Sequence, residues 1–310
     1  MHVMKPLWGV FTVAVLLGIG GLEVIHAQTK KPIRIQLASF SIEPIDSDMN
    51  CNSYVIPAGY SPSSRHYTKN RSIKTAQAQA PDFSATDDLS KGRALYNSKK
   101  YRESLYHFQE AAKLGSGEAM TYAGYLYAEG LGVERNPAEA VRWYRMAAEA
   151  GNSWGMSNLA RHYEDGVGVP QDYSEALRWY RKAADAGSAR AMYGVARIYR
   201  YGLGVKKDEA AAVYWMRKSA DAGFAMGMTG LGDLYRRGIG VKQDYTKAMM
   251  WFHQGVSAGD AAAMSCIGYM YEKGLGVDRN LPEALDWYVR AAAKGDKYAE
   301  AWLRKFGPRK

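Results

Sequence analysis

Apolar and small side chains recur at helical spacing through most of the chain after about residue 89. In one segment the positions i, i+3, i+4 and i+7 are held by Met120, Ala123, Gly124 and Tyr127. In the next segment the same positions are held by Ala140, Trp143, Tyr144 and Ala147. This spacing places four side chains on one face of a helix, so each segment predicts an amphipathic helix.

The pattern of two helices repeats with a constant period. Glycine returns every 36 residues, at Gly115, Gly151, Gly187, Gly223, Gly259 and Gly295. The same step relates the tryptophans Trp143, Trp179, Trp215, Trp251 and Trp287, and the methionines Met120, Met156, Met192, Met228 and Met264. A fixed period of this length predicts a solenoid, in which each unit buries its apolar face by stacking on its neighbours. We therefore interpret the tryptophans and methionines as core residues, not as a cofactor site.

A Gly-x-Gly-Val loop joins the two helices of each unit. Its glycines supply the positive φ angles of a helix end and a tight turn. A side chain suited to an N-cap follows at Asn136, Asp172, Asp208, Asp244 and Asn280. Because the loop occurs five times with the same residues, geometry explains it better than catalysis or phosphate binding.

These columns together resemble the SEL-one-like repeat (SLR), a relative of the tetratricopeptide repeat with a longer loop. Five full copies cover residues 116–295, residues 89–115 resemble a tetratricopeptide-like N-terminal cap, and residues 296–310 form a C-terminal capping helix. The resemblance implies an all-α, right-handed α-solenoid of about thirteen helices, whose first helices line the concave face. It also implies a non-catalytic scaffold or regulatory adaptor that binds a protein or peptide partner in a bacterial cell envelope.

Positions that differ between units are the candidates for recognition. On the first helices the candidates for partner binding are Tyr125, Arg161, Arg197, Arg200, Tyr201, Arg236, Arg237 and Tyr269. Arginine binds carboxylates with two parallel hydrogen bonds, so the cluster favours an acidic partner. The alternative is a solvated face on which these arginines pair with Glu164, Asp165 and Asp233.

The first residues have a different composition. Residues 1–27 hold a basic start, an apolar stretch and Ala27, which is typical of a signal peptide cleaved near Ala27. We expect export to a periplasmic or extracellular space, and the alternative is an uncleaved membrane anchor. Residues 28–88 are polar and lack periodicity, which predicts a mostly disordered linker in which Cys51 is an unpaired thiol.

The chemistry of the remaining residues excludes several classes of function. The formal net charge is +10, yet no basic stripe or nucleic-acid motif occurs, so we expect no nucleic-acid partner. Some secreted proteins with similar repeats have been assigned β-lactamase or penicillin-binding activity, which stays an alternative. No Ser-x-x-Lys, HExxH or paired cysteine motif is present, so the sequence predicts neither catalytic residues, nor a metal site, nor a cofactor. His162 replaces an aliphatic residue in its column and is interpreted as a satisfied core or rim histidine, and Cys266 as a small buried or lining residue.

Overall fold

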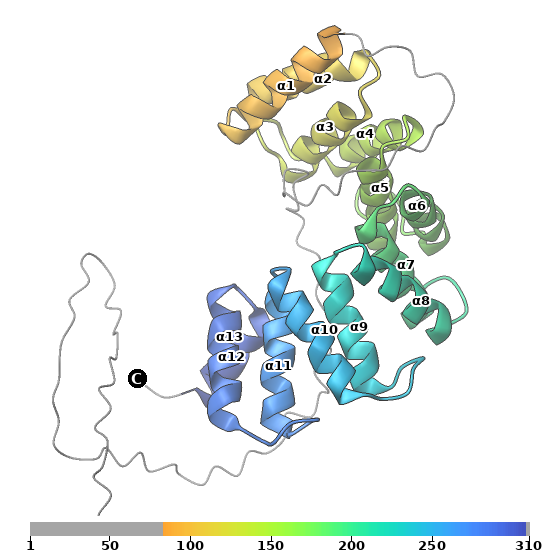
Figure 1. Ribbon diagram of the computed structural model, residues 1–310. Helices are drawn as coiled ribbons and strands as arrows, with labels where there is room; N and C mark the ends of the chain where they lie inside the picture. The colour runs from red at the N-terminus through yellow and green to blue at the C-terminus, as the bar shows by residue number, and fades with distance from the viewer. Residues whose placement is uncertain (1–82, 308–310) are drawn as a thin grey trace, which may run out of the picture. The chain divides into compact units, whose positions relative to one another are not determined.

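The computed structural model describes residues 83–307, all of whose regular elements are helices (Figure 1). The thirteen helices are α1 (Phe83–Asn97), α2 (Tyr101–Lys113), α3 (Gly117–Glu129), α4 (Pro137–Glu149), α5 (Ser153–Asp165), α6 (Tyr173–Asp185), α7 (Ala189–Tyr201), α8 (Glu209–Asp221), α9 (Ala225–Arg237), α10 (Tyr245–Ser257), α11 (Ala261–Lys273), α12 (Leu281–Ala293) and α13 (Lys297–Phe306). The predicted all-α fold and the number of helices are therefore confirmed.

Each helix packs on the helices next to it in sequence. The contacts are most extensive within the pairs α1–α2, α3–α4, α5–α6, α7–α8, α9–α10 and α11–α12, and each pair then packs on the next. Stacking of like units is the arrangement of an α-solenoid, as the period of the sequence predicts.

The predicted caps form at the start of the second helix in each of the five full units. The side chains of Asn136, Asp172, Asp208, Asp244 and Asn280 each accept a hydrogen bond from a backbone N–H in the first turn of the helix that follows. These bonds satisfy donors that a helix leaves unpaired at its N-terminus. The first helices α3, α5, α7, α9 and α11 end at a left-handed glycine, which is the first glycine of each loop.

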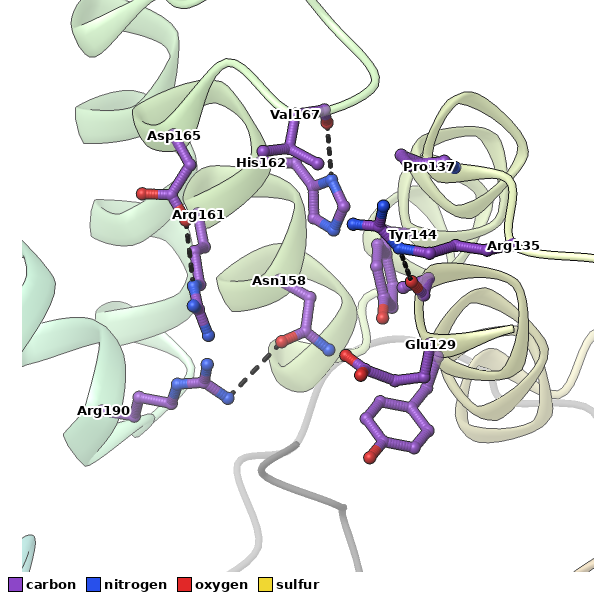
Figure 2. A pocket seen from close by; sticks show the side chains of 12 residues that line it. Glu129, Arg135, Pro137, Tyr144, Asn158, Arg161, His162, Asp165, Val167 and Arg190 are labelled. Carbon is purple, nitrogen blue, oxygen red and sulfur yellow. Dashed lines mark hydrogen bonds and ion pairs between the residues drawn. The ribbon is translucent and has the colours of Figure 1, made fainter. Parts of the chain in front are cut away.

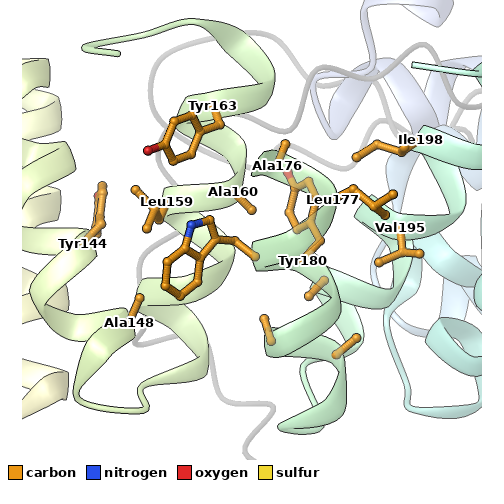
Figure 3. Packing of buried hydrophobic residues seen from close by; sticks show 14 of the residues in the cluster. Tyr144, Ala148, Leu159, Ala160, Tyr163, Ala176, Leu177, Tyr180, Val195 and Ile198 are labelled. Atoms are coloured by element: carbon orange, nitrogen blue, oxygen red, sulfur yellow. The ribbon is translucent and has the colours of Figure 1, made fainter. Parts of the chain in front are cut away.

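The core is continuous from one unit to the next. Figure 3 shows Leu159 and Ala160 of α5, Tyr180 of α6, and Val195 and Ile198 of α7 packed in one cluster. None of the five repeated tryptophans is exposed, and the repeated methionines are buried or half-buried. These residues therefore serve packing, as predicted.

The second glycine of each loop contacts the preceding unit. A Cβ atom placed at Gly168 would lie 2.3 Å from the Pro137 carbonyl oxygen, and one at Gly240 would lie 2.4 Å from the Glu209 carbonyl oxygen. Both partners lie at the start of the second helix of the unit before. A side chain would therefore separate consecutive units, which is a second reason for glycine besides the turn.

The ends of the helical array differ from its middle. Helix α1 begins at Phe83, inside the segment that the sequence assigns to the linker, and Asp88 of that helix lies 2.8 Å from the ring of His107. At the other end, Trp302 of α13 stacks on Tyr288 with ring centroids 4.4 Å apart. The predicted signal peptide and Cys51 lie outside the described residues.

Candidate partner-binding surface

Three positions in the C-terminal half of each first helix form the surface proposed for recognition, which we call the first-helix face. The mid-helix position holds Tyr125, Arg161, Arg197, Asp233 and Tyr269. The last-turn position holds Ala128, Glu164, Arg200, Arg236 and Glu272, and the end position holds Glu129, Asp165, Tyr201, Arg237 and Lys273. The hydrophobic faces of the same helices are packed into the core, so these side chains are placed by the stacking itself.

The last-turn residue of one unit contacts the mid-helix residue of the next unit. Glu164 forms an ion pair of 3.2 Å with Arg197, and it also accepts a 2.8 Å hydrogen bond from the Tyr180 hydroxyl. Burial opposes the charge on Arg197, but Glu164 and the nearby tyrosine hydroxyls outweigh it and raise the pKa of the guanidinium. The Glu164 carboxylate is thus held by one donor from its own unit and one cation from the next.

In the next unit the two charges are exchanged. Arg200 donates to Asp233 at 2.7 Å, and Arg236 donates to the other oxygen of the same carboxylate, also at 2.7 Å. All three side chains are at least 95% buried. In the following unit Arg236 lies over the ring of Tyr269, with 5.1 Å between the guanidinium carbon and the ring centroid.

The structure thus separates the residues that the sequence proposes for partner binding into three groups, which are buried, exposed and half-buried. Arg200 and Arg236 meet at Asp233 inside the protein, and Tyr125 is 8% exposed. Tyr201 is 42% exposed, and Arg237 beside its helix end is exposed as well. Arg161, Arg197 and Tyr269 are half-buried. Tyr201 and Arg237 are accordingly the members of the set that present most surface to a partner.

A cavity of about 130 Å³ opens on this face between the first two full units. Figure 2 shows Arg161, Asn158 and His162 of α5, Tyr144 of α4 and Arg190 of α7 around it. Three guanidinium groups, from Arg135, Arg161 and Arg190, and two carboxylates, from Glu129 and Asp165, complete the charged lining. Among these, Arg161 donates to Asp165 at 3.1 Å and Arg190 to the Asn158 amide oxygen at 3.4 Å.

His162 lies at the edge of this cavity. Its Nδ1 atom is 2.7 Å from the Val167 carbonyl oxygen, and its ring lies against that of Tyr144. Burial lowers the pKa of the imidazole, although the Val167 carbonyl acts in the opposite direction. The sequence interpretation as a satisfied core or rim histidine agrees with this environment.

Other kinds of site receive no support from the described part of the chain. Between residues 83 and 307 no group of three or more histidine, cysteine or acidic side chains is arranged to hold a metal ion. No helix in this range is long and apolar enough to cross a membrane. Cys266 is fully buried and disulfide-bonded, so its sulfur is not a nucleophile.

Comparison with known proteins identifies the family. The sequence profile named "Sel1 repeat" matches residues 91–116, 117–152, 155–188, 189–224, 225–260 and 261–296. The chain therefore belongs to the Sel1 repeat family, and the predicted resemblance is confirmed. Proteins of this family are generally scaffolds for protein interactions and are typically non-catalytic. The profile also matches the first helical pair, which the sequence analysis sets apart as a tetratricopeptide-like cap.

Two crystal structures from bacteria are similar to this chain. A Sel1 repeat protein from Oxalobacter formigenes is 34% identical with a TM-score of 0.64, over 70% of this chain and 89% of that protein. The protein c5321, described as a protective antigen of uropathogenic Escherichia coli strains with an SLR fold, is 34% identical with a TM-score of 0.59. That match covers 72% of this chain and 50% of c5321, so this chain spans half the length of that relative. A search of curated proteins found no match.

Proposed function

We propose that this protein is a non-catalytic scaffold or regulatory adaptor of a bacterial cell envelope, which binds a partner protein or peptide on its first-helix face. One observation supports the proposal above the others. The recurring residues of each unit are engaged in packing, capping or turning, whereas the first-helix face carries different residues in each unit. A surface with a changing set of arginines, carboxylates and tyrosines over a constant frame is suited to recognition.

The cellular location is part of the same proposal. The apolar stretch near the N-terminus, which lies outside the described residues, is typical of a signal peptide, and both relatives described above are bacterial. We propose export, with cleavage near Ala27. Mass spectrometry of the mature N-terminus distinguishes cleavage from the alternative of a retained membrane anchor.

Site-specific crosslinking in cells tests where the partner binds. A photoreactive amino acid is introduced at Tyr201 on the first-helix face, and in a matched variant at Tyr214, a more exposed tyrosine of α8. The two side chains are 42% and 56% exposed, so neither position disturbs the core. The proposal requires a specific crosslinked product from position 201 that is absent from position 214. It is wrong if position 214 gives the same product or if position 201 gives none.

A second variant tests the charge of the partner. Arg237→Glu reverses an exposed charge on the first-helix face without entering the buried cluster at Asp233. If the partner is acidic, the crosslink from position 201 decreases in this variant.

Turnover of nitrocefin by the purified protein would instead favour the alternative of a β-lactamase-like activity.

A further inference from the structure

The cavity on the first-helix face lies where one member of a repeated interaction is missing. In the second unit, the last-turn residue Glu164 contacts the Tyr180 hydroxyl and Arg197. Shifting these residues back by one period gives Ala128, Tyr144 and Arg161. The tyrosine and the arginine of the first unit are therefore present, but the carboxylate between them is replaced by a methyl group.

The last unit repeats the arrangement with other donors. Glu272 accepts hydrogen bonds from the Tyr288 hydroxyl at 2.9 Å and from the Trp302 indole at 3.0 Å, and it lies 2.8 Å from the ammonium group of Lys273. In both units in which the second helix carries a tyrosine and the last-turn residue is acidic, the carboxylate thus accepts a hydrogen bond from the tyrosine hydroxyl. In the units with Arg200 and Arg236, the equivalent second-helix residues are Met216 and Phe252, which have no hydroxyl to satisfy.

Tyr144 is the tyrosine without this acceptor. It is 2% exposed, and the last-turn position that supplies the acceptor for Tyr180 and Tyr288 is held here by Ala128. Burial raises the pKa of Tyr144, so the group remains a donor at any physiological pH. Tyr144 and Ala128 both line the cavity of about 130 Å³, so an acceptor placed in the cavity can receive the hydrogen bond of the Tyr144 hydroxyl.

We propose that this cavity, which we call the Tyr144 pocket, binds a carboxylate group of the partner in the place that Glu164 and Glu272 occupy in their own units. The carboxylate accepts a hydrogen bond from the Tyr144 hydroxyl and faces the guanidinium groups of Arg161 and Arg190. Asn158, which also lines the cavity, follows Ala128 by 30 residues as Trp302 follows Glu272, and its amide nitrogen is a further donor. The inference rests on the proposed function and specifies one chemical group that the partner must supply.

The charges around the pocket are consistent with this ligand. Three guanidinium groups outnumber the carboxylates of Glu129 and Asp165 by one. His162, at the rim, is disfavoured in its charged form by burial, so it adds no fixed charge at neutral pH. An arginine that faces an anion in a partly buried site forms a charge-assisted hydrogen bond, which is stronger than one between neutral groups.

Three peptides, titrated into the full-length protein and followed by NMR on the backbone amides of α5, test the pocket. Acetyl-Gly-Gly-Glu-Gly-Gly-amide carries a side-chain carboxylate, acetyl-pentaglycine a C-terminal carboxylate, and acetyl-Gly-Gly-Gln-Gly-Gly-amide is the neutral control. We expect saturable shifts with one or both carboxylate peptides, with a Kd on the order of 1 mM, and none with the glutamine peptide. The peptide that binds identifies the source of the carboxylate.

Two substitutions then assign the binding to the pocket. Ala128→Glu supplies the missing carboxylate from the protein itself, so it should abolish peptide binding and raise the Tm. Ala128→Gln, of the same size but neutral, should raise the Tm less. Tyr144→Phe removes the hydroxyl donor and should weaken binding roughly tenfold.

Four results would overturn the inference: no binding of either carboxylate peptide, equal binding of the glutamine peptide, unchanged binding by the Ala128→Glu variant, or a Tm of that variant no higher than that of Ala128→Gln. The crosslinking experiment at Tyr201 has an independent outcome. Carboxylate binding without a crosslink would reject the proposed function and keep the pocket. A crosslink without carboxylate binding would do the reverse.

Discussion

Individual side chains on the first-helix face vary between units in a correlated way. Glu164 forms an ion pair with Arg197, and at the equivalent positions one unit later Arg200 forms an ion pair with Asp233. The acidic and the basic residue have therefore exchanged positions together. The exchange keeps a cation beside an anion in a region with little water, where an unpaired charge would be costly. Variation between units therefore serves contacts between units.

The sequence contains this information, but its columns do not show it directly. The last-turn residue contacts a residue 33 positions later, as Arg200 contacts Asp233. When each repeat position is considered separately, both residues are assigned to one surface, and the contact between them is not predicted. The predicted set consequently combines exposed residues such as Tyr201 with buried ones such as Arg236. Whether these residues bind a partner stays a prediction.

His162 makes a testable contribution to the pH dependence of stability. Its pKa is lowered in the folded protein, chiefly by burial, whereas the unfolded chain has the ordinary value of about 6.5. Above that pH both states are neutral and no stability is lost. As the pH falls through 6.5 toward the folded pKa, the unfolded state binds the proton first and folding becomes less favourable.

The variant His162→Leu restores the aliphatic type found at Leu126, Ile198 and Leu234 in the same column. We expect the free energy of unfolding, measured with urea at pH 7.5 and 5.5, to fall less between the two pH values in this variant than in the wild type. Equal decreases would show that the imidazole is not the group responsible.

At the scale of the helices and loops, local residue chemistry accounts for most of the structure. The five N-caps and the left-handed glycines were predictable because each depends on residues within one turn. The close approach of the second loop glycine to the preceding unit was not, because it depends on how two units stack. Hydrogen bonds between consecutive units also depend on how the units stack, so they were not predictable either. An example is the Thr121 hydroxyl, which donates to the side chain of Asn152, 31 residues later.

Substitutions at two glycines can distinguish the cost of a positive φ angle from the cost of a close contact between units. Gly168 has a φ of +75° and no space for a Cβ atom, whereas Gly151 has a φ of +80° and nothing within 4 Å of that atom. We expect Gly151→Ala to reduce the free energy of unfolding by about 1 kcal/mol, through backbone strain alone. Gly168→Ala should reduce it by about 2 to 4 kcal/mol because overpacking is added. Equal effects in urea denaturation would mean that the units readjust around the added methyl group.

At the scale of the whole helical array, contacts between helices remain local in sequence. The principal contacts of the described helices join elements that are one or two apart in order. Stability in such an array is the sum of unit and interface contributions, and one end can open while the other stays folded. This property distinguishes a solenoid from a globular domain with a single core, and it makes the effect of a core mutation depend on its position.

Trp302→Ala tests this property at the C-terminal end. The indole is 7% exposed, stacks on Tyr288 and donates to Glu272, so its removal should cost about 3 to 5 kcal/mol locally. Hydrogen exchange measured by mass spectrometry should become faster in α11, α12 and α13 and stay unchanged in α1 to α8. The variant Trp179→Ala, which removes a buried indole from the middle of the array, should instead accelerate exchange on both sides of α6.

If Trp302→Ala accelerates exchange uniformly from α1 to α13, the array unfolds as one cooperative unit, and a disturbance at one end reaches the Tyr144 pocket as well. If the effect is confined to the last helices, the pocket between α3 and α7 keeps its carboxylate-binding geometry, and peptide affinity in the variant should equal that of the wild type.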